Sequence, residues 1–198
     1  MTHLAISPSV ALTFCCTNFN YALKLFHTCY SCGMAYSQKY SIVQFFQSVD
    51  EDAVFSINDW PLHTTLVDVF AVHLDESVLD RLTKLLATKR PMVIKAVDDT
   101  TLGSTDNPVL VTLIEKDSNL QSLHDDLVSL LEQCGAVFNS PQYTHEGFLP
   151  HCTVQRHARI NPDDSFEVNE LSIIDMFVDG DWEKRKVLKK IKLSAKRF

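Results

Sequence analysis

The sequence predicts an α+β fold with two lobes of similar build, in which two antiparallel sheets line a central groove and helices cover the outside. Two observations predict it. Runs of β-branched and aromatic residues alternate with helical apolar stripes, and this order of elements occurs twice along the chain. The segments PLHTTL and LPHCTV also occupy corresponding places, one in each half. We therefore expect lobes at about 40–105 and 106–198.

The elements of the first half follow from local patterns. Segments 40–47 and 63–73 are rich in β-branched and aromatic residues, which is typical of strands. Asp75 is placed to cap a helix, whose apolar stripe consists of Val78, Leu82, Leu85 and Leu86. Residues 91–99 form the next expected strand, with a proline at its start.

The second half repeats this order. A strand is expected at 108–116, and Ser118 with Gln121 reads as a capping box that opens a helix. Gly135 follows the helical stripe as its C′ residue. Three further strands are expected, at 148–157, 166–178 and 184–193.

Composition limits the class of protein. The chain has 198 residues, 45% hydrophobic and 22% charged, which suits one ordinary soluble domain. No apolar run approaches the roughly 20 residues that span a bilayer, so we expect no membrane partner. The formal charge of −7 argues against a protein that coats nucleic acid. We expect a monomer.

The cysteines and the first 33 residues need separate treatment. Four of the six cysteines precede residue 34, whereas a disulfide framework would spread them through the fold. We therefore expect a reduced, cytoplasmic protein. Cys29 and Cys32 form a CxxC pair, but a zinc site needs a second pair of ligands and a thioredoxin-like site needs a flanking strand and helix. We expect 1–33 to be a poorly ordered extension or an over-extended translation start, and 34–198 to be a single domain.

The paired His-x-Thr segments carry the chemistry. Successive side chains of a strand point to opposite faces, so His63 shares a face with Thr65, and His151 shares one with Thr153. One neutral imidazole can take a proton from an attacking oxygen while the other, as imidazolium, protonates the leaving oxygen. The threonine hydroxyls can donate to the non-bridging oxygens of a phosphate. The scheme needs no metal or other cofactor.

The two segments resemble the paired motifs of the 2H phosphoesterase superfamily, and EGFLPHCTVQRH is similar to the second-motif region of its 2′-5′ RNA ligase-like branch. The resemblance covers about 40–193 in element order. It implies hydrolysis or transesterification of phosphodiesters, such as 2′,3′-cyclic phosphates at RNA ends or small cyclic nucleotides. It implies His63, Thr65, His151 and Thr153 as the catalytic set, with the second-motif histidine as base and the first as acid.

Other interpretations stay open at this point. A histidine on an apolar strand is often structural, and a module that grips RNA ends without turnover would keep the same groove. A metalloenzyme is less favoured because no HExxH or His-x-His arrangement is present. Tyr143, His145 and Phe148 precede the second motif and are candidate substrate-binding residues; a plain surface loop, or core in the case of Phe148, is the alternative.

The last strand is basic. Lys184, Lys186, Lys190 and Lys192 share one face, which either steers RNA phosphates or protects an edge strand from pairing with another sheet. The edge interpretation is slightly favoured.

Overall fold

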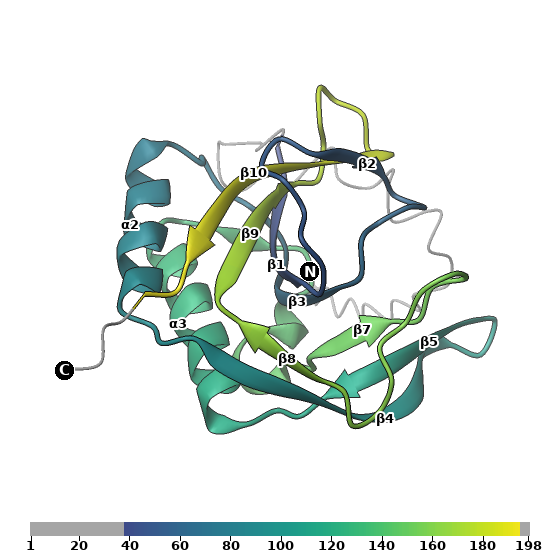
Figure 1. Cartoon of the computed structure of the whole chain (residues 1–198). Coiled ribbons are helices and arrows are strands. Elements are labelled where there is room, and N and C mark those ends of the chain that lie inside the picture. Colours follow the sequence, from purple (N-terminus) through teal and green to yellow (C-terminus); the bar gives the residue numbers. More distant parts are fainter. Residues whose placement is uncertain (1–37, 195–198) are drawn as a thin grey trace, which may run out of the picture. The chain divides into compact units, whose positions relative to one another are not determined.

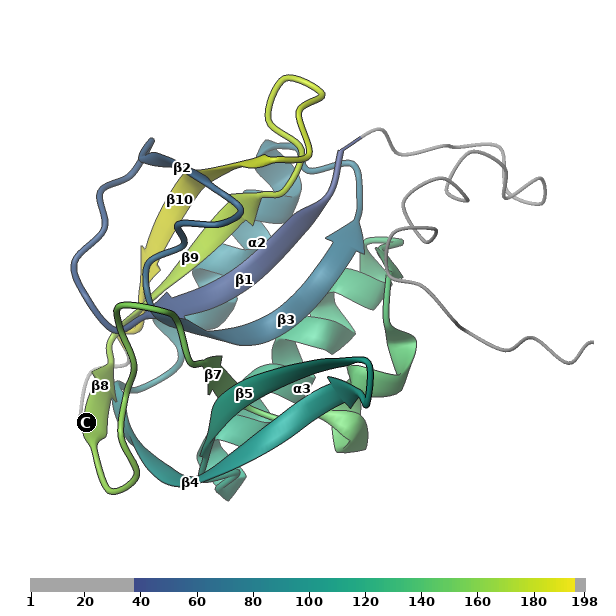
Figure 2. The same ribbon diagram turned by 90° about the vertical axis from the view of Figure 1, so that its right-hand side faces the viewer.

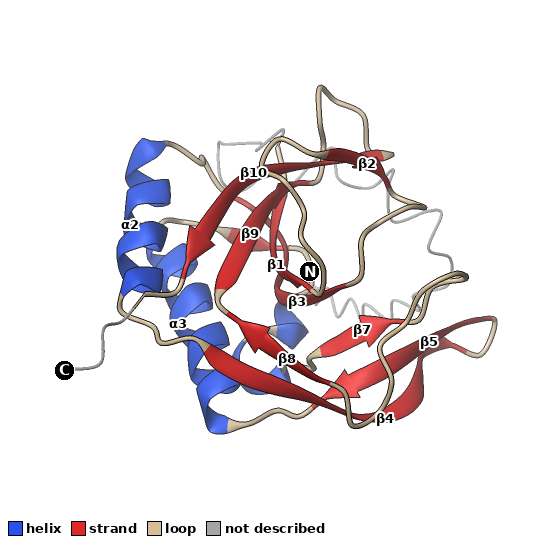
Figure 3. Cartoon of the chain, viewed as in Figure 1, coloured by secondary structure: helices blue, strands red, loops and turns tan. Residues whose placement is uncertain are grey.

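A computed structural model describes residues 38–194, so the CxxC pair and the whole of 1–33 lie outside the described residues. The α+β fold with two antiparallel sheets is confirmed (Figure 1). Figure 3 shows the helices on one side of the domain and the strands of both sheets on the other.

The elements follow one another in a regular order along the chain. The strands are β1 (Tyr40–Phe45), β2 (Val54–Ser56), β3 (His63–Ala71), β4 (Met92–Ser104), β5 (Asn107–Ile114), β6 (Val137–Phe138), β7 (His151–Thr153), β8 (Ser165–Val168), β9 (Glu170–Asp175) and β10 (Lys184–Lys192). The helices are α2 (Glu76–Ala87) and α3 (Ser118–Gln133), with short 3-10 turns η1 (Pro141–Tyr143) and η2 (His145–Gly147).

The two sheets draw strands from both ends of the chain. The six-stranded sheet has the order β2-β10-β9-β1-β3-β6, and the four-stranded sheet has the order β7-β5-β4-β8 (Figure 2). The sheets therefore do not coincide with the sequence halves 40–105 and 106–198. The reason is that β9 and β10 return to pair beside β1, while β4 and β5 turn back on each other as a hairpin across the expected boundary.

The ends of the helices are marked by capping residues. Asp75 caps α2 by accepting a hydrogen bond from the N–H of Val78, as expected. The cap of α3 is different from the expected one: Asp117, not Ser118, accepts from the N–H of Leu120. Gly135 follows the last turn of α3 with a φ of 79°, which a residue with a side chain adopts only at a cost.

The core lies mainly between the helices and the strands. Both helices contribute their apolar stripes, and β1, β3, β4, β5 and β9 contribute their inward-facing residues. A smaller cluster on the other face of the six-stranded sheet contains Val43, Phe45, Val49, Ile174 and Val187, with Phe55 and Trp60 packed against it. This second cluster lies beside the first His-x-Thr strand, where Phe45 and Trp60 approach the ring of His63.

Two of the expected strands differ in the structure. The expected strand 148–157 is reduced to β7, because Pro150 has no N–H to donate and the last hydrogen bond to β5 runs from the N–H of Val154 to the carbonyl oxygen of Leu110. The expected strand 166–178 is divided at Asn169 into β8 and β9, which belong to different sheets.

The lysines of β10 are largely engaged in ion pairs. Lys184 pairs with Asp181, Lys186 with Asp52, and Lys190 with Glu170. The strand is not at the outer edge over its first residues, since Lys184–Lys186 pair with β2. The structure therefore supports neither an open RNA-steering face nor a simple edge over these residues.

Candidate active site

The fold brings the two His-x-Thr strands side by side from different sheets. β3 lies within the six-stranded sheet, β7 is an end strand of the four-stranded sheet, and the two strands are in contact (Figures 1 and 2). Gln155, just after β7, links the two strands by donating a hydrogen bond to the carbonyl oxygen of Trp60, just before β3.

The two histidine rings are held in the same way. His63 Nδ1 lies 2.8 Å from the carbonyl oxygen of Pro61, and His151 Nδ1 lies 2.7 Å from that of Leu149. A carbonyl oxygen only accepts, so Nδ1 carries the hydrogen in both rings. Nε2 is then the nitrogen of each ring that can exchange a proton with a ligand, which is the arrangement that acid–base catalysis needs.

The environments of the two rings are different. The ring of His63 lies 4.4 Å from the ring of Trp60 and 6.0 Å from that of Phe45. Burial lowers the pKa of His63 to about 4; the hydrogen bond to Pro61 opposes this change, and the charge of His151 adds to it. The ring of His151 is instead partly exposed and lines a pocket.

The remaining motif residues occupy distinct surroundings. Thr65 lines a pocket with His151, whereas Thr153 is exposed at the end of β7. Thr64 and Cys152 point away from the site into the interior, as strand alternation requires. Burial raises the pKa of the Cys152 thiol to about 11, so it is not a ready nucleophile.

A pocket of about 370 Å³ extends from the second motif along β3. Its walls come from β3, the β4–β5 hairpin, α3 and the segment before β7, so it lies between the two sheets and fits the expected central groove. Its apolar wall includes Leu102, Val109 and Tyr143. None of the residues that line it is a lysine or an arginine, and Asp68 is its one carboxylate.

Of the three candidate substrate-binding residues, two line this pocket. Tyr143 is half exposed there, and Phe148 is buried against the ring of His124, with ring centres 4.1 Å apart and planes within 5° of parallel. His124 was not singled out from the sequence. The one feature of the sequence that could have indicated it is that this histidine lies on the apolar stripe of α3, between Leu123 and Leu127, which are both fully buried.

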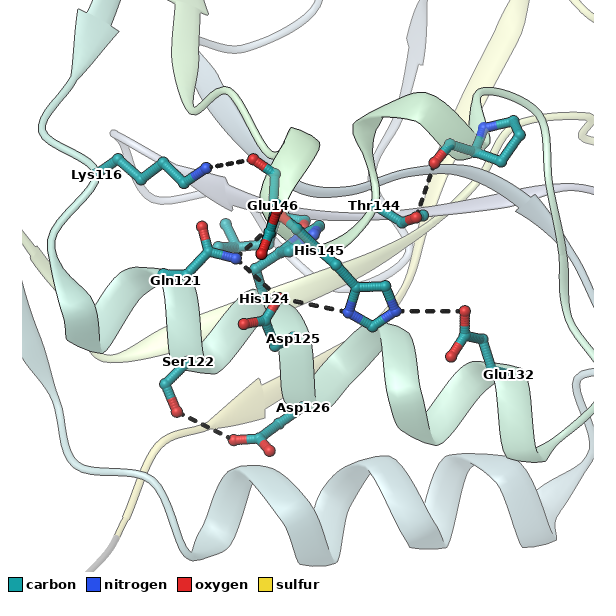
Figure 4. Close-up of polar contacts among 12 residues, drawn as sticks. Lys116, Gln121, Ser122, His124, Asp125, Asp126, Glu132, Thr144, His145 and Glu146 are labelled. Carbon is teal, nitrogen blue, oxygen red and sulfur yellow. Dashed lines mark hydrogen bonds and ion pairs between the residues drawn. The ribbon is translucent and has the colours of Figure 1, made fainter.

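His145 lies outside the pocket, on the outer side of α3. Its Nδ1 is 3.5 Å from a carboxylate oxygen of Asp125 and its Nε2 is 3.4 Å from one of Glu132 (Figure 4). Gln121 donates to the main-chain oxygen of His145, and Lys116 donates to that of Glu146. These contacts fasten the turn before the second motif to α3.

Two negative findings apply to residues 38–194. No group of three or more histidine, cysteine, aspartate or glutamate side chains is arranged so that it could hold a metal ion. No helix in this part of the chain is long and apolar enough to cross a membrane.

Comparison with known families gives one match. The family model described as the 2′-5′ RNA ligase superfamily matches residues 40–174, which include both His-x-Thr segments and the pocket between the sheets. No curated protein is significantly similar in sequence.

Solved structures share the fold at low sequence identity. A crystal structure titled as a phosphoesterase is 18% identical, with a TM-score of 0.50, and the match covers 79% of this chain and 99% of that one. The protein TT0787 of Thermus thermophilus is 15% identical, also with a TM-score of 0.50, over 80% of this chain and 100% of that one. At these identities the likeness concerns the fold alone.

Proposed function

This chain belongs to the 2′-5′ RNA ligase superfamily, and from that membership and the paired histidines we propose that it is a metal-independent cyclic phosphodiesterase. Membership itself supports a phosphoesterase or RNA ligase-like activity. The finer proposal is that the substrates are 2′,3′-cyclic phosphates at RNA ends or small cyclic nucleotides. The observation that carries it is the matched geometry of His63 and His151, each with Nδ1 fixed by a main-chain carbonyl and Nε2 left for proton exchange.

The reaction proceeds by one displacement at phosphorus. One imidazole takes a proton from water as its oxygen bonds to phosphorus, and the bond from phosphorus to one ribose oxygen breaks. The other imidazole, as imidazolium, gives its proton to that ribose oxygen, so the charge of the pair is unchanged. Thr65 and Thr153 donate hydrogen bonds to the non-bridging oxygens as negative charge grows on them.

The same site can join RNA ends. If a 5′-hydroxyl replaces water and the 3′-oxygen leaves, the product is a 2′-5′ phosphodiester with a free 3′-hydroxyl. Exclusion of water then decides between hydrolysis and ligation. We propose this ligation as a secondary activity of the same two histidines.

The direction of proton transfer depends on the substrate's charge. Burial holds the pKa of His63 at about 4 in the free protein, so at neutral pH its ring is neutral. The family resemblance implies His63 as the acid, which requires a protonated ring. A bound phosphodiester anion favours the imidazolium. We therefore propose that His63 takes up its proton together with the substrate, while His151 accepts the proton from water.

The test is turnover of an oligonucleotide that ends in a 2′,3′-cyclic phosphate, with EDTA present, by wild type and His151→Ala. Cleavage by wild type and its loss in the variant support the proposal. Equal cleavage by both proteins contradicts it. Tight, salt-sensitive binding without any product would instead favour a non-catalytic module that grips RNA ends or nucleotides.

Two broader proposals accompany this activity. We propose that residues 34–198 form one phosphoesterase-like domain and that the protein works as a monomer in the cytoplasm. Free Cys134 and Cys152 suit a reducing compartment. Sedimentation of the purified protein as a dimer would contradict the monomer.

A further inference from the structure

The pocket continues beyond the reacting groups, and its far part differs in chemistry from its near part. Thr65 and His151 mark the near part. Asp68 lies three residues further along β3, a separation of about 10 Å at the rise of a strand. A ligand that fills the pocket from His151 onward therefore reaches Asp68.

Asp68 has no partner in the described part of the chain. Its carboxylate lines the pocket and makes no hydrogen bond or ion pair there. A carboxylate only accepts hydrogen bonds. No lysine or arginine among the pocket-lining residues offsets its charge, so a second phosphate of a ligand would be repelled from this end.

His124 provides a second acceptor nearby. Its Nδ1 lies 2.6 Å from the carbonyl oxygen of Leu66, between Thr65 and Asp68 on the same strand, so Nδ1 carries the hydrogen. Burial lowers the pKa of His124, which keeps the ring neutral and leaves Nε2 as an acceptor. That Nε2 atom is buried and has no hydrogen-bond partner among the described residues.

The walls around these acceptors are apolar. Leu102 and Val109 of the β4–β5 hairpin and the half-exposed Tyr143 line the same pocket. Apolar walls with a few fixed polar groups are the usual design of a site that orients a flat ring. A nucleobase fits this description if its edge donates hydrogen bonds.

We propose that Asp68 and His124 form a distal subsite that selects nucleotides whose base carries an exocyclic amino group. This inference rests on the proposed function, because it needs the phosphate at the two histidines. An amino group donates to the carboxylate, as cytosine N4 does to aspartate in other complexes, whereas the carbonyl of uracil presents a second acceptor and is repelled. Asp68 is thus a specificity residue and takes no part in proton transfer.

The experiment compares cytidine 3′-monophosphate with uridine 3′-monophosphate, which differ at this edge by an amine against a carbonyl. Affinities are measured by titration calorimetry with the full chain, as wild type, Asp68→Asn and Asp50→Asn. Asp50 is an exposed aspartate outside the pocket and serves as the matched control. We expect wild type and Asp50→Asn to bind the cytidine nucleotide about tenfold more tightly, and Asp68→Asn to bind both alike.

Two results would overturn the subsite: equal affinities in wild type, or a preference that survives in Asp68→Asn. Thermal unfolding of each variant shows whether it is folded. If wild type cleaves cyclic nucleotides without regard to the base, the subsite fails and the proposed function stands. If folded wild type binds neither nucleotide and cleaves no cyclic phosphate, both fail.

Discussion

The two His-x-Thr strands share their sequence pattern and their ring geometry, yet they differ in surroundings. β3 is a nine-residue strand paired on both sides, and His63 at its start is covered by Trp60 and Phe45. β7 has three residues at the end of its sheet, and its Thr153 is exposed. The same motif thus stands in two unequal environments, because packing rather than local sequence covers the ring of His63 and leaves Thr153 exposed.

The largest expected effect comes from removing either imidazole. His63→Ala and His151→Ala should each lower turnover of a 2′,3′-cyclic phosphate by about 10²- to 10⁴-fold, since each removes one proton-transfer group. His73→Ala, which alters an exposed histidine, should leave turnover unchanged. Near-normal rates in either motif variant would contradict the proposal that both histidines take part in the reaction.

The buried His63 should make stability depend on pH. Its pKa is about 4 in the folded protein and near 6.5 when unfolded, so between these values the unfolded chain binds more protons. The free energy of unfolding therefore falls as pH falls through this window. Urea unfolding between pH 7 and pH 4 should show a loss that is roughly 3 kcal/mol larger in wild type than in His63→Gln.

His151→Gln is the comparison variant for this measurement. This variant should still lose stability as pH falls from 7 to 4, because Trp60 and Phe45 still cover the ring of His63. A similar pH profile for wild type and His63→Gln would mean that His63 is not buried as described.

The next largest effect is a difference between the two threonines in their contribution to kcat. Thr65 lines the pocket whereas Thr153 is exposed, so a donor lost at Thr65 is less easily replaced by water. We expect Thr65→Val to lower kcat by about 100-fold and Thr153→Val by about 10-fold. Steady-state kinetics on one cyclic nucleotide would measure both losses in kcat. A larger loss in Thr153→Val than in Thr65→Val would place the phosphate nearer to β7.

The smallest effect concerns the turn that carries the second motif. A Cβ on Gly147 would lie 1.9 Å from the main-chain oxygen of Gln142, so Gly147→Ala must move the backbone before His151. We expect a loss of about 2 kcal/mol in the free energy of unfolding. Gly135→Ala has nothing within 4 Å and only an unfavourable φ, so it should cost about 1 kcal/mol.

Activity adds a second readout to this pair. Gly147→Ala should also reduce turnover, because it displaces the second motif, whereas Gly135→Ala should not. Equal activity of the two folded variants would show that β7 is held by its pairing with β5 rather than by the preceding turn.

Much of the fold was predictable because its signals are local. The strands at 40–45, 63–71 and 107–114 have the β-branched and aromatic residues expected of them, and Asp75 and Gly135 mark helix ends by their own chemistry. The division of 166–178 between two sheets was not predictable, because the break at Asn169 is decided by which strands return to pair.

The candidate site shows the same division between local features, which the sequence predicts, and features that only the tertiary structure decides. The sequence by itself determined that two imidazole–hydroxyl pairs stand at the starts of two strands, since alternation along a strand is a local property. Only the tertiary structure decided that Trp60 and Phe45 cover His63, that His145 faces α3, and that His124 and Asp68 meet the same pocket. Burial and charge environment arise from residues far apart in the chain, and these set both the pKa of His63 and the shape of the pocket.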